Sequence, residues 1–430
     1  MIKPCLIDLK GAAMPLRARN IVFAPGLFGW GPPDEMNAIL PYWGDARAQL
    51  DGGAFRIHEA KVGPVSSFHD RACELYAQIR GRRVDYGAAH SSAAGHDRFS
   101  PTLTFEGRGL VEGWSAENPV ILIGHSAGAQ TCLILQQLLR EGLWNAPGDE
   151  TSADWIEVVV SVAGVLNGST LPYMFGCDKS SGALSRGLSP QAISSLIKLA
   201  NAAGAQLDYT PGLVSLWLDH WAGAADEARS AAWFEASPFV TGTDNLAYDL
   251  TLQGCRKAND RFEASPNTYY LSLVTGATRA PPVLKTIGGA LTRLFGQTPG
   301  PRAIPEASML PLLLPSALYQ ASVTFDARPI PGWGEGDLKL DAWSENDGAV
   351  SSISQRYPFT GQQAAPVAAG GFMEGRPPER GKWCFERIET VAGLRFDHLD
   401  PVFGISAKSH ALREAHQTLW RKLGERLNTL

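Results

Sequence analysis

Five short stretches rich in β-branched and aromatic residues recur along the chain, and each ends at or near a glycine. They lie at residues 20–26, 55–63, 118–124, 155–164 and 268–276. Apolar residues at helical spacing occupy several of the intervals, including residues 129–142. Because strands that alternate with helices form parallel sheets, this pattern predicts an α/β fold with a mostly parallel central sheet flanked by helices.

The last part of the sequence carries another helical pattern. Residues 406–430 place large apolar side chains on one stripe, namely Leu412, Leu419, Trp420, Leu423 and Leu427. This stripe predicts a final helix that packs on the sheet. Residues 277–340 and 360–382 are rich in proline and glycine and lack periodicity, which predicts long loops.

The composition is that of a globular protein. The chain has 430 residues, of which 44% are hydrophobic and 19% charged, enough for a sizeable core. We expect one domain over residues 1–430, because α/β folds with insertions reach this length as a single unit. No apolar run reaches the roughly 18 residues of a membrane span, so a soluble protein is expected. A net charge of -5 without a Lys/Arg run argues against nucleic acid as a partner.

The cysteines and the N-terminal residues give little information about the cellular location of the protein. The six cysteines are scattered without a C-x-x-C spacing, so they are expected to be separate small apolar residues. The first residues lack a basic start followed by an apolar run, so no secretory signal is expected in this sequence. A cytoplasmic location and export after processing both stay open.

The clearest chemical motif is the sequence Gly-His-Ser-Ala-Gly at residues 124–128. It lies directly after a predicted strand and directly before a predicted helix, which is the context of a nucleophile elbow. In such a turn the residues that flank the serine must be small, because the backbone doubles back on itself. The motif therefore predicts Ser126 as a nucleophile.

A serine nucleophile needs a base, and in this arrangement the acid and the histidine follow the serine in the chain. Of the later histidines, His410 and His416 fall on the predicted final helix, and His220 precedes any late strand. His398 follows a short strand-like run and is the predicted base. Asp347, in an Asn-Asp-Gly turn, is the predicted acid, with an ordinary surface turn as the alternative.

The oxyanion of acyl transfer needs two backbone N–H donors. One comes from the residue after the nucleophile, which is Ala127, and the other from the loop after an early strand. The glycine-rich residues 24–31 follow the first predicted strand, and the N–H of Leu27 is the predicted second donor.

Two histidines, His90 and His96, lie six residues apart among small residues. Taken alone, this spacing favours ordinary loop histidines over metal ligands, since it is not a sharp zinc signature.

Several longer blocks resemble the thermoalkalophilic bacterial true lipases. The blocks are "YWGDAR", "VGPVSSFHDRACELYAQIRG", "VDYGAAH", "GHDRF", "LDHW", "SPNTYYLS" and "ENDG". The resemblance covers residues 20–275 nearly continuously, and then residues 341–349 and 394–400. It implies an α/β-hydrolase fold with a zinc-binding extra domain.

Carried over residue by residue, the resemblance implies the same nucleophile, acid and base as the chemical argument. It also implies a zinc site formed by Asp70, His90, His96 and Asp244. Four protein ligands would fill a tetrahedral zinc, so the ion should be structural rather than catalytic. The ligands would tie an insertion at residues 64–100 to Asp244 within residues 208–250.

The sequence also departs from the family pattern. The oxyanion loop reads Pro25-Gly26-Leu27 where the family has His-Gly-Phe, and Gly124 and Ala127 stand where the family usually has Ala and Gln. The family's calcium site uses an acidic residue two positions after the catalytic histidine, which Asp400 could supply, and then an Asp-Pro pair. No such pair follows, so calcium is not predicted.

The resemblance implies a helical lid within residues 172–207. Residues 187–207 open with a helix cap and an apolar face, so a core helix is the alternative. The implied activity is that of a serine carboxylester hydrolase of lipase type, with a lipid or other ester as substrate and transient contact with a lipid surface. The alternatives are an esterase for short or soluble esters, or polyesters, and a non-catalytic, zinc-stabilised binding protein with the same fold.

Overall fold

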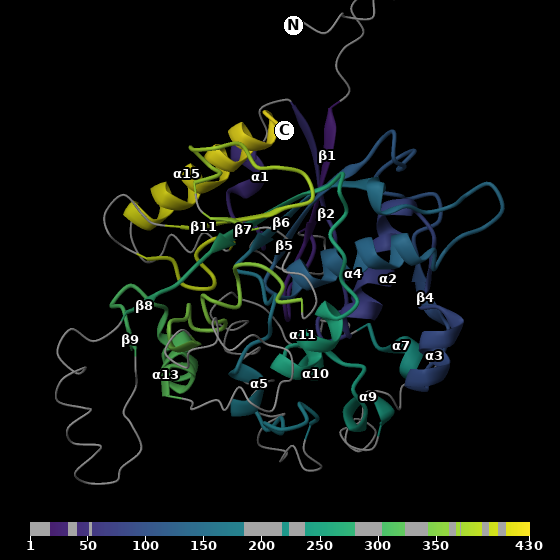
Figure 1. Ribbon diagram of the computed structural model, residues 1–430. Helices are drawn as coiled ribbons and strands as arrows, with labels where there is room; N and C mark the ends of the chain where they lie inside the picture. Colours follow the sequence, from purple (N-terminus) through teal and green to yellow (C-terminus); the bar gives the residue numbers. More distant parts are fainter. Residues whose placement is uncertain are drawn as a thin grey trace, which may run out of the picture.

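A parallel sheet forms the centre of the protein (Figure 1). This computed structural model describes residues 18–32, 41–50, 54–184, 217–222, 237–279, 303–322, 343–360, 367–369, 371–388, 395–402 and 410–430. Within them seven strands lie in the order β10-β11-β7-β6-β5-β1-β2, with every neighbouring pair parallel. The strands are β1 (Arg19–Ala24), β2 (Phe55–Glu59), β5 (Val120–His125), β6 (Ile156–Val162), β7 (Tyr269–Val274), β10 (Val367–Ala369) and β11 (Trp383–Arg387).

Five of these strands lie where the hydrophobic pattern predicts them, so the predicted parallel sheet is confirmed. Strands β10 and β11 extend the sheet beyond β7. Residues 360–382 were predicted as loop, and this was wrong at β10. A strand of three residues is too short to show a period of two, which explains the difference.

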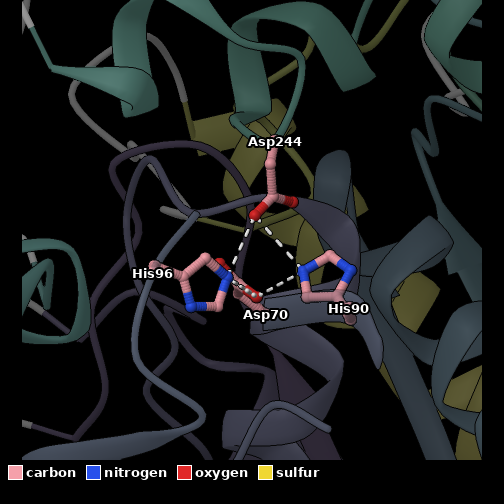
Figure 2. Close-up of side chains that lie close together, drawn as sticks. All are labelled: Asp70, His90, His96 and Asp244. Atoms are coloured by element: carbon pink, nitrogen blue, oxygen red, sulfur yellow. Dashed lines mark hydrogen bonds and ion pairs between the residues drawn. The ribbon is translucent and has the colours of Figure 1, made fainter. Parts of the chain in front are cut away.

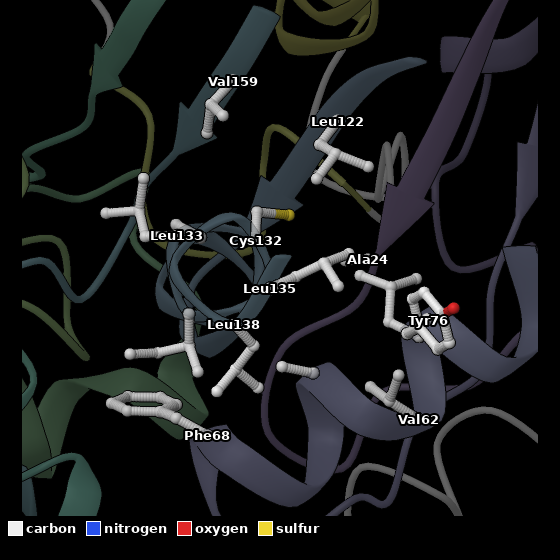
Figure 3. Packing of buried hydrophobic residues seen from close by; sticks show 14 of the residues in the cluster. Ala24, Val62, Phe68, Tyr76, Leu122, Cys132, Leu133, Leu135, Leu138 and Val159 are labelled. Carbon is white, nitrogen blue, oxygen red and sulfur yellow. The ribbon is translucent and has the colours of Figure 1, made fainter. Parts of the chain in front are cut away.

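Helices cover both faces of the sheet. Helices α2 (Phe68–Arg80), α4 (Ala127–Glu141) and α11 (Leu252–Asn259) contribute to the apolar core on one face, and α1 (Ala46–Leu50) and α15 (His410–Leu427) to the core on the other. Alternate residues of β5 supply the two cores, with Leu122 in the first and Ile123 in the second. Figure 3 shows side chains of α2 and α4 meeting those of β5 and β6 in the first core.

The predicted final helix is confirmed as α15. All five residues of its predicted stripe are buried in the second core. His416 is also buried, whereas His410 is exposed.

Residues 64–100 are more regular than the expected loop-rich insertion. They hold α2, a hairpin of β3 (Arg83–Asp85) and β4 (Phe99–Thr104), and α3 (Ala88–Ala94). The Ser67 side chain caps α2 by accepting a hydrogen bond from the N–H of Asp70, and Gly81 ends the helix in the left-handed conformation. Nearly every residue of α2 is buried, so this helix belongs to the core rather than to an appended loop.

Short elements connect these layers. They are η1 (Ala153–Trp155), α5 (Leu171–Met174), α7 (Asp219–Ala222), α9 (Pro238–Thr241), α10 (Leu246–Asp249), β8 (Thr278–Arg279), β9 (Ile304–Pro305), η3 (Pro311–Leu313) and α13 (Leu314–Ser322). The predicted lid helix at 187–207 lies outside the described residues. In the described ranges, no helix has both the length and the apolar character needed to cross a membrane.

Candidate active site and metal cluster

Ser126 occupies the tight turn between β5 and α4. Its φ of 56° and ψ of -122° form a strained conformation that non-glycine residues rarely adopt. The flanking glycines have no room for a side chain, since a Cβ on Gly124 would lie 2.4 Å from the backbone of Gly128, and one on Gly128 would lie 2.1 Å from the carbonyl oxygen of Ala24. The turn therefore has the shape that the sequence motif predicts.

The structure brings Ser126, His398 and Asp347 together from three distant parts of the chain. The Nε2 atom of His398 lies 3.0 Å from the Ser126 Oγ, and its Nδ1 lies 2.9 Å from the Asp347 Oδ2. A carboxylate only accepts hydrogen bonds, so Nδ1 carries the proton and Nε2 presents its lone pair to the serine hydroxyl. This tautomer is the one that a general base requires.

Asp347 is fully buried and surrounded by donors. Its Oδ1 accepts hydrogen bonds from the N–H groups of Ala349 and Val350, and its Oδ2 also accepts from the Thr275 hydroxyl and the Gln355 amide. Burial raises the pKa of Asp347, but the electrostatic interaction with the His398 ring and these hydrogen bonds outweigh burial and hold the pKa below its usual value. The carboxylate is thus ionised and fixed in orientation.

A second histidine, His125, contacts the predicted base, with the ring centroids of His125 and His398 4.8 Å apart. Burial lowers its pKa to about 3, so it is neutral. Its Nε2 lies 3.0 Å from the carbonyl oxygen of His398, which can only accept, so Nε2 donates there and Nδ1 accepts from the Tyr42 hydroxyl at 2.7 Å. The Tyr42 oxygen in turn accepts the N–H of Gly26 at 2.8 Å. This chain of bonds connects the residues 25–27 loop to the backbone of His398.

The peptide groups that carry the two predicted oxyanion donors lie beside the serine. A Cβ on Gly26 would lie 2.8 Å from the Cβ of Ser126, so this loop touches the nucleophile. The carbonyl of Ser126, which shares a peptide group with the N–H of Ala127, accepts bonds from Ala129 and Val165. Its orientation is therefore set by the backbone alone.

The segment that carries His398 is held by the final helix. The ring Nδ1 of His416 donates to the carbonyl of Asp400 at 2.9 Å, and the indole N–H of Trp420 donates to the carbonyl of Pro401 at 2.8 Å. Both donors lie on α15 and both side chains are buried. The position of the histidine segment thus depends on α15.

The structure also gathers the four residues predicted to bind metal, Asp70, His90, His96 and Asp244 (Figure 2). Asp70 lies in the first turn of α2, His90 on α3, His96 just after α3, and Asp244 between α9 and α10. One atom from each residue lies within 4.8 Å of all the others. The cluster therefore joins two segments about 150 residues apart.

Several distances between the ligand atoms of the four side chains are compatible with a tetrahedral metal ion. The Nε2 of His90 lies 3.2 Å from oxygens of Asp70 and Asp244, and the Nε2 of His96 lies 3.3 Å from Asp244 and 3.8 Å from Asp70. Bonds of about 2.0–2.1 Å place tetrahedral ligand atoms about 3.3 Å apart. Two carboxylates and two neutral imidazoles would also balance the charge of a divalent ion.

Two buried atoms of the cluster lack a hydrogen bond. They are the Nε2 of His96 and the Oδ2 of Asp244. The other ring nitrogen of His96, Nδ1, lies 2.8 Å from the carbonyl of Asp97 and must donate to it, which leaves Nε2 with a free lone pair. Buried polar atoms are normally paired, so these atoms fit a site that holds a cation.

The two carboxylates of the cluster favour a positive charge between the four side chains. Burial lowers the pKa of His90, but the carboxylates of Asp244 and Asp70, each 3.2 Å from its Nε2, outweigh burial and raise the pKa to about 10. The carboxylates therefore attract a cation, and a divalent ion would displace the proton.

His220 borders the cluster. Its Nε2 lies 3.2 Å from the second carboxylate oxygen of Asp70, and it is buried against the ring of Tyr86. Such a contact orients a carboxylate so that its other oxygen faces the ion.

Proteins of similar sequence and structure point to one family. A family profile described as "Lipase-like, C-terminal domain" matches residues 18–147. A lipase of Staphylococcus epidermidis is 25% identical over 428 residues, which cover 95% of this chain and 53% of that relative. The structure of EstA from Clostridium botulinum matches with a TM-score of 0.67 at 26% identity, covering 96% of this chain and 88% of the other. That of lipase 1 from Pelosinus fermentans matches with a TM-score of 0.62 at 28% identity, covering 95% and 99%.

The chain is a relative of the bacterial lipases.

The implied α/β-hydrolase fold is confirmed by these lipase relatives and by the parallel sheet. The chain spans about half the length of the curated relative from S. epidermidis.

Some residues of the lipase-like site escaped the sequence analysis. Tyr42, Thr275 and Gln355 touch the triad or its neighbours only through contacts between residues far apart in the chain. No local pattern marks them. The "LDHW" block that contains His220 is one of the blocks that resemble the lipase family. This resemblance did not predict a role for His220 itself.

Proposed function

We propose that the chain is a serine carboxylester hydrolase of lipase type. The Oγ of Ser126 attacks the ester carbonyl carbon while Nε2 of His398 takes its proton. The alcohol then leaves with that proton, and the acyl group stays on Ser126. A water molecule, deprotonated by His398, attacks this acyl-enzyme, and the acid and the free serine result.

The buried carboxylate of Asp347 stabilises the imidazolium that forms at each proton transfer. The N–H groups of Leu27 and Ala127 hold the oxyanion. Within the described part of the chain neither N–H has a protein acceptor, so both are free to donate to a substrate oxygen. Each such donor contributes about 3–4 kcal/mol of transition-state stabilisation.

The unbroken line of hydrogen bonds from Asp347 through His398 to Ser126 is the observation that carries this proposal. It is tested by hydrolysis of p-nitrophenyl esters. Wild-type protein should cleave them, and Ser126→Ala should lose essentially all activity while its thermal unfolding stays unchanged. Equal hydrolysis by the two proteins would favour the non-catalytic binding protein.

The acyl length of the substrate separates a lipase from a short-chain esterase. A lipase should cleave long chains up to palmitoyl and respond to an emulsified substrate. A preference for dissolved acetyl or butyryl esters in the same set of measurements would instead identify a short-chain esterase.

We also propose that Asp70, His90, His96 and Asp244 hold a zinc ion. All four positions would be filled by protein atoms, so the ion ties residues 64–100 to Asp244 and leaves no site for water or substrate. Metal analysis of protein purified without added metal should find one zinc per chain. Protein that folds and is active with no bound metal would contradict the proposal.

The domain arrangement stays a proposal too. We infer one catalytic domain with a metal-binding insertion at residues 64–100 and a lid within residues 172–207. Support for the insertion is the metal cluster itself, since three of its four ligands come from these residues.

A further inference from the structure

Arg71 is a fully buried cation that the mechanism above does not use. It follows Asp70 on α2, and it forms no ion pair with any carboxylate of the described residues. Burying a guanidinium is costly unless its donors are satisfied. The donors of Arg71 are satisfied mainly by main-chain carbonyl oxygens. The segments to which these carbonyls belong are therefore the ones that Arg71 holds in position.

The guanidinium joins three segments. Its Nη1 donates to the carbonyl of Gly63 at 2.6 Å, its Nη2 donates to the carbonyls of Pro25 and Gly26, and its Nε donates to the Thr131 hydroxyl at 3.1 Å. Pro25 and Gly26 belong to the loop that touches Ser126. Thr131 lies on α4, and its hydroxyl donates to the carbonyl of Ala127 at 3.1 Å.

The contact with Gly26 controls the direction of an oxyanion donor. In a trans peptide group the carbonyl and the following N–H point in opposite directions. The carbonyl of Gly26 accepts bonds from the N–H of Gly29 at 3.1 Å and from Arg71 at 3.4 Å, so these bonds also aim the N–H of Leu27. The other donor, at Ala127, is aimed by the backbone bonds that the carbonyl of Ser126 accepts from Ala129 and Val165.

We propose that Arg71 is a positioning residue of the oxyanion hole, because it holds the carbonyls of Pro25 and Gly26 and thereby the loop that carries the Leu27 N–H, while Thr131 anchors the guanidinium to α4. The inference rests on the proposed esterase function. Hydrogen bonds from a guanidinium are charge-assisted, so they hold their acceptors more strongly than bonds between neutral groups do. Lysine cannot replace it, because a single ammonium lacks the planar fork that reaches several acceptors.

The test compares Arg71→Lys and Arg71→Met with wild type in kcat, KM and inhibition by phenylboronic acid, which forms a tetrahedral adduct on an active serine. A displacement of about 1 Å in a catalytic group can cost a hundredfold in rate. We expect kcat to fall about tenfold for Arg71→Lys and about a hundredfold for Arg71→Met, with KM within twofold. The inhibition constant of the boronate should rise in proportion to the loss in kcat.

Cys73→Ala is the matched control, because it is also a buried change on α2. It should lower thermal stability but leave kcat and boronate inhibition within twofold. Thr131→Val, which removes only the hydroxyl contact, keeps the proposal testable if Arg71→Met does not fold. It should lower kcat less than Arg71→Met does.

The proposal is overturned if both Arg71 variants keep wild-type kcat, or if kcat falls while boronate inhibition stays unchanged. A rise in KM alone would also overturn it, since that result would place Arg71 in substrate binding or general packing. Failure of the proposed function is a different result, in which wild-type protein itself cleaves no ester.

Discussion

At the scale of single residues, the proposed catalytic chemistry depends on which atoms can donate a proton. Asp347 can only accept, so it fixes the proton on Nδ1 of His398. The carbonyl of His398 likewise fixes the tautomer of His125. Two histidines in contact thus hold opposite tautomers, with Nε2 unprotonated on His398 and protonated on His125.

Asp347→Asn should lower kcat about ten-thousandfold, because the amide presents a donor to Nδ1 and favours the wrong tautomer. The change in size is minimal, so thermal unfolding should change far less than activity. The measurement is kcat on a p-nitrophenyl ester beside Asp260→Asn, a surface carboxylate paired with Arg256. The assignment of Asp347 fails if both variants retain wild-type activity.

At the scale of elements, α2 stands between two sites. Its first turn supplies Asp70 to the metal cluster and Arg71 to the loop beside Ser126. Apolar packing against α4 holds the same helix to the sheet.

Removing the metal should loosen α3 and the residues around Asp244 before it loosens the sheet. Without the proposed ion, Asp244 and the ligands at residues 70–96 no longer share a binding partner. The apolar cores on both faces of β5 keep their contacts. Hydrogen exchange after chelation should therefore rise at residues 88–97 and 237–250 and stay low in β5 and β6. Added zinc should restore protection in wild type but not in Asp244→Asn. Uniform loss of protection across the chain would contradict a local role.

At the scale of the whole molecule, the sequence was a good guide to the layers and a partial guide to the site. Strand and helix positions follow from local periodicity, so β1, β2, β5, β6, β7 and α15 could be predicted. Ser126 could be found because a nucleophile elbow is a local motif. His398 and Asp347 needed chain order and chemistry, and the structure does bring them to Ser126.

What could not be predicted depends on contacts between distant segments. Arg71 and Thr131 are 60 residues apart, and Tyr42 and His125 are 83 apart. No local sequence pattern around these four residues shows that the two members of each pair are in contact. Strand β10 was not predicted for another reason, because three consecutive small apolar residues show no alternation of apolar and polar positions.

The hold of α15 on the histidine segment has a consequence for biosynthesis. His398 is made 272 residues after Ser126, and the donors that fix its segment, His416 and Trp420, are made later still. The nucleophile elbow and most of the sheet are complete long before then. A nascent chain therefore holds the Ser126 turn before its proposed base is made, so the proposed ester-cleaving chemistry must wait until α15 is made and has docked.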